Sequence, residues 1–134
     1  SEEYAGLINL KRFEEFLQTD LGKRMGSAYK KGLLFREQPF IMELGADMID
    51  KEYPSDEKIL VQGIVDAFFF ENDKVYIVDY KTDRVEQGKA GEKALVERYH
   101  KQLELYADTI SRVTGKETGG CYIYSTCLKK EILI

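Results

Sequence analysis

A β-hairpin predicted at the centre of the chain constrains the fold more than any other feature. Residues 59–70 and 75–81 are rich in β-branched and aromatic side chains, which are typical of buried strands. The segment 71–74, Glu-Asn-Asp-Lys, separates them and has the composition of a tight turn. A protein with this hairpin must bury it in a sheet, so the chain is expected to contain a central sheet.

The register of this hairpin is expected to bring three charged side chains together. A turn centred on residues 72–73 places Asp66 opposite Asp79. Because side chains alternate along a strand, Lys81 shares the face of Asp79 and is expected to pair with Ile64, diagonally across from Asp66. We therefore predict Asp66, Asp79 and Lys81 on one otherwise apolar face of the sheet.

Two carboxylates in an apolar strand repel each other unless a cation lies between them. Lys81 supplies one positive charge, and a divalent metal would supply more. Oxygen ligands without a neighbouring Cys or His favour Mg²⁺ or Mn²⁺ over zinc. The alternative is a buried Asp–Lys ion pair with the second Asp solvated, but buried ion pairs contribute little to stability. The pattern therefore favours a metal site.

A metal held by carboxylates beside a lysine suits phosphodiester hydrolysis. The metal polarises a phosphoryl oxygen and acidifies water, and the lysine orients that water or neutralises developing charge. Glycoside hydrolysis also uses paired carboxylates, but it needs one acid with a raised pKa, which a neighbouring cation opposes.

The rest of the chain reads as alternating helices and strands around this hairpin. The predicted elements are a helix in two pieces over 9–31, with Asn9 and Thr19 or Asp20 as N-caps, a strand over 33–44 with Pro39 at an edge or bulge, a loop over 51–58, a loop over 82–91, a helix from about 92 to Gly115, a break at Gly119-Gly120, a strand over 121–126 and a possible strand over 131–134. This order predicts an α/β domain.

Composition excludes several classes of protein. A length of 134 residues suits one domain, and no apolar run approaches the roughly 18 residues of a membrane-spanning helix. The chain shows no signal-peptide pattern and has two cysteines, so we expect a cytoplasmic protein. A net charge of -4 argues against a protein that coats nucleic acid, so any DNA contact must come from a local site and binding should be weak.

Several motifs resemble those of the PD-(D/E)xK nuclease superfamily. G-I-V-D at 63–66 and D-Y-K-T-D at 79–83 resemble its motifs II and III. R-E-Q-P-F at 36–40 and Y-x-x-Q-L-x-L-Y at 99–106 are similar to its RecB-type branch, most of all to the C-terminal nuclease domain of a helicase–nuclease. The resemblance covers nearly the whole chain. It implies a restriction-endonuclease-like α/β core, in which helices flank a mixed central sheet in the order αβββαβ.

The resemblance also implies roles for individual residues. Asp66, Asp79 and the backbone carbonyl of Tyr80 would bind Mg²⁺ or Mn²⁺, and Lys81 would act on the attacking water. Gln102 and Tyr106 match the Q-x-x-x-Y signature of the branch, whose side chains lie close to the metal. Their spacing of four residues independently places both on one helix face. On pattern alone, Gln102 could equally be a polar residue at the rim of that face, and Tyr106 a core residue.

The implied function is metal-dependent exonucleolytic hydrolysis of single-stranded DNA within an ATP-dependent helicase–nuclease that serves double-strand break repair and recombination. The implied partners are DNA, a helicase domain upstream in the same chain and a second nuclease subunit in a heterodimer. The metal-ligating histidine that the family carries on an N-terminal helix has no counterpart before Leu7. We therefore expect residues 1–134 to be a single nuclease domain, a C-terminal fragment that begins after that helix.

Two alternatives stay open at this point. The same residues would suit a free-standing exonuclease of the RecB or Cas4 kind. In a different class, the domain would be a non-catalytic interaction module with a nuclease fold. The iron–sulfur variants of the branch need four cysteines, so no iron–sulfur cluster is expected here.

Overall fold

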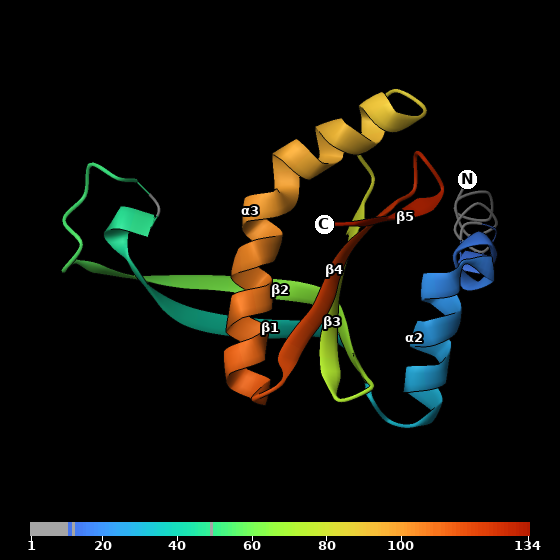
Figure 1. The fold of residues 1–134 in the computed structure, drawn as a ribbon, viewed down its shortest axis with the longest axis horizontal. Coiled ribbons are helices and arrows are strands. Elements are labelled where there is room, and N and C mark those ends of the chain that lie inside the picture. Colours follow the sequence, from blue (N-terminus) through green and yellow to red (C-terminus); the bar gives the residue numbers. More distant parts are fainter. Residues whose placement is uncertain (1–10, 12, 49) are drawn as a thin grey trace, which may run out of the picture.

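The computed structural model describes residues 11, 13–48 and 50–134. The elements follow the predicted order, and the possible last strand is present (Figure 1). They are α2 (Asp20–Lys30), β1 (Leu34–Gly45), the 3-10 helix η1 (Ala46–Met48), β2 (Lys58–Glu71), β3 (Lys74–Lys81), α3 (Lys89–Thr114), β4 (Glu117–Ser125) and β5 (Lys130–Leu133). Among the described helices, none combines the length and the apolar character needed to span a bilayer.

The five strands form one mixed sheet in the order β1-β2-β3-β4-β5. Neighbouring strands are antiparallel except for β3 and β4, which run parallel and are connected by α3. A parallel pair needs such a long crossover connection, and a helix usually provides it. Pro39 lies in β1, at the edge of the sheet, where a missing backbone donor is tolerated. The predicted α/β class and the mixed central sheet are confirmed.

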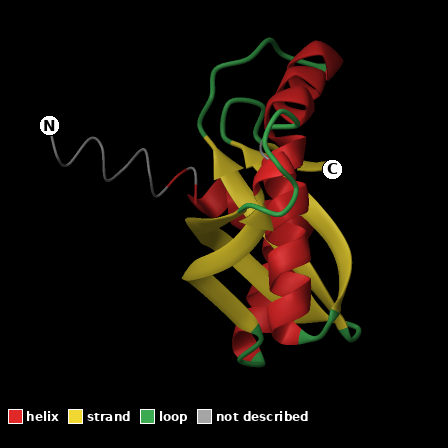
Figure 2. Cartoon of the chain, turned by 90° about the vertical axis from the view of Figure 1, so that its left-hand side faces the viewer, coloured by secondary structure: helices red, strands yellow, loops and turns green. Residues whose placement is uncertain are grey.

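Helices cover both faces of the sheet, which creates two hydrophobic cores (Figures 1 and 2). On one face α3 buries Leu95, Leu103 and Ile110 against the strands. On the other face α2 buries Leu21 and Met25. The end of β3 lies between these two layers, so consecutive residues there face different environments.

The helix break predicted near residue 19 is present. Thr19 is the N-cap of α2, and its hydroxyl accepts a hydrogen bond from the backbone N–H of Gly22 at 3.0 Å. Gly32, with φ +71°, ends the segment in a conformation that favours glycine. The proposed cap at Asn9 lies outside the described residues.

Two predicted boundaries around α3 and β4 are wrong. The helix begins at Lys89, three residues earlier than expected, and the Gly119-Gly120 pair lies inside β4 instead of breaking the chain. The ring of Tyr76 packs over this glycine pair, and a Cβ on Gly119 would lie 2.4 Å from Tyr76 Cζ. Glycine is therefore needed here for close packing of an aromatic ring.

The predicted hairpin register is correct near the turn and fails at its far end. Ala67 pairs with Val78 as expected, and positive φ angles at residues 72–73 form the turn. The ladder between β2 and β3 stops at that pair, so the predicted pairing of Asp66 with Asp79 is wrong. The predicted pairing of Lys81 with Ile64 is wrong, because Ile64 pairs with β1 and Lys81 pairs with Ser125 of β4.

The alternation of β2 also changes phase at Asp66. Val65 and Phe68 both belong to the core under α3, although side chains three residues apart in a regular strand point to opposite faces. On the neighbouring β1, Glu37 has φ +51°, and Glu37 and Asp66 do not pair although the ladder keeps one register on both sides of them. This local irregularity leaves the Asp66 side chain at the point where β2 and β3 separate.

Candidate active site

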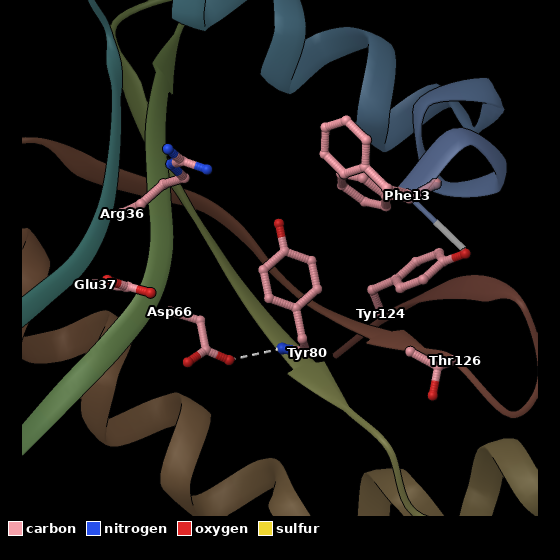
Figure 3. A pocket seen from close by; sticks show the side chains of 8 residues that line it. Phe13, Arg36, Glu37, Asp66, Tyr80, Tyr124 and Thr126 are labelled. Atoms are coloured by element: carbon pink, nitrogen blue, oxygen red, sulfur yellow. Dashed lines mark hydrogen bonds between the residues drawn. The ribbon is translucent and has the colours of Figure 1, made fainter. Parts of the chain in front are cut away.

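Asp66 bridges the gap between the separating strands. Its Oδ2 accepts a hydrogen bond from the backbone N–H of Tyr80 at 2.9 Å, where β2 no longer offers a backbone carbonyl (Figure 3). A carboxylate therefore satisfies a donor that the ladder leaves free. This contact holds Asp66 beside the end of β3.

Asp79 and Lys81 lie on the face of β3 that α3 covers. Asp79 is only 4% exposed, and Lys81 Nζ lies 2.7 Å from its Oδ2. This contact is an ion pair, and among the described residues no hydrogen bond is assigned to the buried Oδ2. A buried carboxylate oxygen whose neighbour is a single cation still has lone pairs for a further ligand.

Burial raises the pKa of Asp79 to about 6, with Asp66 adding to the rise and Lys81 opposing it. Asp66 contributes through the repulsion between two like charges. Burial by itself would lower the pKa of Lys81, but Asp79 outweighs it and raises that pKa above its ordinary value. The lysine therefore stays protonated at neutral pH.

Gln102 and Tyr106 of α3 extend this cluster. Lys81 Nζ donates to Gln102 Oε1 at 3.2 Å, and Gln102 Nε2 donates to the Tyr106 hydroxyl at 3.1 Å. The Tyr106 ring also packs edge-on against Phe40, 5.1 Å away between centroids. The structure thus brings together all five predicted side chains, and Tyr106 combines a polar contact with core packing.

The side chain of Tyr80 points away from this cluster. Its ring packs edge-on against Phe16 at 5.6 Å, on the α2 side of the sheet. The resemblance implies the backbone carbonyl of Tyr80 as a metal ligand, and Tyr80 follows Asp79 in the chain and is hydrogen-bonded to Asp66. Tyr80 therefore separates two environments on opposite faces of β3.

An aromatic ring supports Lys81, and no local sequence pattern indicates this contact. Lys81 Nζ lies 3.9 Å from the centroid of the Tyr99 ring, within the range of a cation–π contact. The Tyr99 hydroxyl donates to Asp83 Oδ2 at 2.7 Å, and Arg98 forms an ion pair with the same carboxylate. Both Asp83 and Tyr99 stand in the motifs, but their contact depends on how α3 packs against the loop after β3.

A comparison with known protein families supports the resemblance. The model of the PD-(D/E)XK nuclease superfamily matches residues 9–131. The chain belongs to this superfamily. Asp79, Tyr80 and Lys81 stand in its (D/E)XK pattern, at the end of β3.

The chain is also similar to three curated relatives, each of which is an ATP-dependent helicase/nuclease subunit (AddA). It is 40% identical to the protein of Clostridium perfringens strain SM101 over 100% of this chain and 11% of the relative. It is 42% identical to that of Thermoanaerobacter sp. strain X514 over 92% of this chain and 10% of the relative. It is 37% identical to that of Listeria monocytogenes strain EGD-e over 87% of this chain and 10% of the relative. The chain thus spans about a tenth of the length of these relatives.

The residues at the site fit a divalent cation, which PD-(D/E)XK nucleases generally require. The buried Oδ2 of Asp79, to which no hydrogen bond is assigned, and the nearby carboxylate of Asp66 are hard oxygen donors of the kind that Mg²⁺ and Mn²⁺ prefer. In the described part of the chain, no cluster of three or more His, Cys, Asp or Glu side chains forms around them. Water, backbone and substrate oxygens would have to complete the coordination.

Proposed function

We propose that this chain is the nuclease domain of a longer, cytoplasmic, ATP-dependent helicase–nuclease and that it hydrolyses phosphodiester bonds of single-stranded DNA with Mg²⁺ or Mn²⁺. The observation that carries the proposal is the cluster in which Asp79 and Lys81 of β3 meet Asp66 of β2 and Gln102 of α3. The names of the relatives support the helicase context. The wider role would be exonucleolytic processing of double-strand breaks for recombination, together with a second nuclease subunit.

Asp66, Asp79 and the backbone carbonyl of Tyr80 would hold the metal, which when bound would polarise a phosphoryl oxygen and acidify water. The two carboxylates differ in how they are fixed. Asp66 is held by the N–H of Tyr80, and Asp79 is held by burial and by Lys81. The carboxylates of Asp66 and Asp79 are therefore both ordered before a substrate arrives, which reduces the free-energy cost of assembling the site.

Lys81 is the only cation in contact with this cluster among the described residues, and its ammonium has three donors. One is directed at Gln102 Oε1. Another donates to the water that attacks the phosphate, or to the non-bridging oxygen on which negative charge develops. Because the pKa of Lys81 is raised, the lysine acts as a positive hydrogen-bond donor rather than as a base.

Gln102 and Tyr106 hold the lysine and approach the phosphate. The amide of Gln102 contacts both Lys81 and Tyr106, so it fixes the distance between them. Tyr106 accepts the amide N–H, which leaves its own phenol hydrogen to donate to a phosphate oxygen. Burial, together with Asp79, raises the pKa of Tyr106, so the phenol keeps this hydrogen at neutral pH.

Cleavage of end-labelled linear DNA tests the proposal. Single-stranded and duplex substrates are incubated with the chain in Mg²⁺, Mn²⁺ or EDTA, beside the Asp79→Ala variant. We expect cleavage of the single strand that is lost in EDTA and in Asp79→Ala. Cleavage that survives both controls would overturn the metal mechanism. No cleavage by this chain or by the full-length polypeptide that contains it would favour the non-catalytic module instead.

A further inference from the structure

A concave surface lies directly beside the candidate metal site, on the face of β3 that α2 covers. It is a pocket of about 440 Å³, and Asp66 forms part of its wall (Figure 3). Lys81, Gln102 and Tyr106 lie outside it, on the α3 side of the sheet. Its lining residues are Phe13, Phe16, Arg36, Glu37, Asp66, Tyr80, Tyr124 and Thr126. The mechanism above uses only Asp66 and the backbone of Tyr80 from this set.

Half of the residues that line the pocket are aromatic. Phe16 packs edge-on against Tyr80 and Tyr124, with centroids 5.6 and 4.8 Å away, so these rings are held in fixed orientations. Phe13 is 54% exposed and Tyr80 is 37% exposed, which leaves aromatic surface open to the pocket. A base can stack on such a surface whatever its identity, because every nucleobase has a π-face.

The pocket lining carries one cation, Arg36, and two carboxylates, Glu37 and Asp66. Arg36 extends from β1 next to Tyr80, on the side opposite Phe13 and Tyr124 (Figure 3). It is exposed and forms no ion pair with any described residue, although it is close enough to Tyr80 to act against the rise in the pKa of that phenol. A guanidinium in this position suits a phosphate or the edge of a base.

We propose that this pocket binds one unpaired nucleobase of the DNA strand, next to the phosphate that is cleaved, with Arg36 on the adjoining backbone. The inference rests on the proposed function, because Asp66 connects the pocket to the metal site. A volume of about 440 Å³ lies in the range of small-ligand pockets and accommodates a single nucleoside, not a duplex.

This pocket gives the domain a physical means of choosing single strands. A base in a duplex is stacked on both sides and paired, so it can enter only after it is unpaired and unstacked, which has a cost of a few kcal/mol. A base of a single strand enters without unpairing. The preference then comes from base access and not from the chemistry of hydrolysis, which is the same for both substrates.

Short single-stranded oligonucleotides that carry one 2-aminopurine at successive positions test the inference, because stacking quenches the fluorescence of this base. Titrations are done in EDTA at low salt, where no hydrolysis occurs. We expect quenching at one or two positions, with affinity lowered at least about 5-fold in Phe13→Ala. Tyr53→Ala is the matched control, because Tyr53 is a similarly exposed aromatic (52%) in the loop before β2. It should bind within about 2-fold of the wild type.

Arg36→Gln provides a second variant at an exposed position. It should lower the affinity for the oligonucleotide and also make that affinity less dependent on salt concentration. Quenching that is equal at every position, or unchanged in both Phe13→Ala and Arg36→Gln, would overturn the pocket assignment. Cleavage of single strands that persists in that case would leave the nuclease function intact. Position-specific quenching without any metal-dependent cleavage would support the pocket and contradict the proposed function.

Discussion

The carboxylate of Asp66 accepts a hydrogen bond from the backbone N–H of Tyr80 at 2.9 Å, and this contact joins two strands that have stopped pairing. Beyond it, β2 continues with β1, and β3 continues with β4. Asp66 therefore has a structural role at the branch point of the sheet, in addition to its proposed role as a metal ligand. These two roles respond differently to substitution.

Asp66→Asn separates the two roles. The amide oxygen of Asn can still accept the Tyr80 N–H, so the free energy of unfolding should fall by less than about 0.5 kcal/mol, whereas Asp66→Ala should lower it by about 1 kcal/mol. Both variants lose the negative charge, so both should lose metal-dependent cleavage by at least about 100-fold. Urea denaturation and cleavage rates measure the two effects. Equal stability of the Asn and Ala variants would contradict the structural role.

Asp79 should make the stability of the metal-free protein depend on pH. Its pKa is about 6 in the folded state and close to 3.8 in the unfolded chain, so between these values the folded state holds a proton that the unfolded state releases. The contribution of Asp79 to the free energy of unfolding is therefore largest below pH 4. It is lost as pH rises through 6, which lowers the free energy of unfolding by about 2–3 kcal/mol.

Asp79→Asn removes this titration. Urea denaturation in EDTA should show the stability of the wild type falling relative to Asp79→Asn between pH 4 and 7. Other carboxyl groups titrate in both proteins, so the difference between the two curves isolates Asp79. Curves that stay parallel over this range would show that burial does not perturb this carboxyl group.

Tyr99 should act as a positioning residue for Lys81. Tyr99→Phe keeps the ring under the ammonium but removes the bond to Asp83, whereas Tyr99→Leu removes both. A cation–π contact contributes about 0.5–2 kcal/mol, so Tyr99→Leu should lower kcat roughly 2- to 30-fold, with little change in KM. Tyr99→Phe should recover most of the rate. Equal rates for the Phe and Leu variants would exclude the ring as the support.

Local sequence patterns were sufficient for the hairpin turn and for the order of elements, because both depend on neighbouring residues. They were not sufficient for the end of the hairpin. Each central strand has two neighbours, and the competition between them decides where one ladder stops, so the pairing of Lys81 with Ile64 could not be excluded from the pattern. The Gly119-Gly120 pair was misread for a similar reason, since the ring of Tyr76 that requires it comes from another strand.

Local sequence patterns also predicted only part of the candidate site. Helical spacing and the motifs placed Gln102 and Tyr106 on one face, and the structure brings them to Lys81. The support of Lys81 by Tyr99 depends on the packing distance between α3 and β3, which no local pattern specifies. The aromatic pocket is likewise formed by segments far apart in the sequence, such as those of Phe13 and Tyr124.

The attachment of α2 can be tested through Arg24. Its guanidinium lies 2.9 Å from Glu71 and 4.6 Å from the centroid of the Tyr76 ring, and its side chain is 29% exposed. Arg24→Ala should lower the free energy of unfolding by about 2 kcal/mol, because it removes charged hydrogen bonds and packing together. Arg112→Ala, which removes an exposed i,i+4 pair with Asp108, should change it by less than about 0.5 kcal/mol. Similar losses in both variants would contradict the anchoring role.

The most direct test of the central claim is the single-turnover rate of single-strand cleavage by Lys81→Met, compared with Lys74→Met. Both lysines lie on β3, but Lys74 is at the hairpin end of the strand and exposed. We predict that Lys81→Met cleaves at least about 100-fold more slowly than the wild type while Lys74→Met stays within about 2-fold. Equal rates for the two variants would contradict the assignment of the catalytic site to the end of β3.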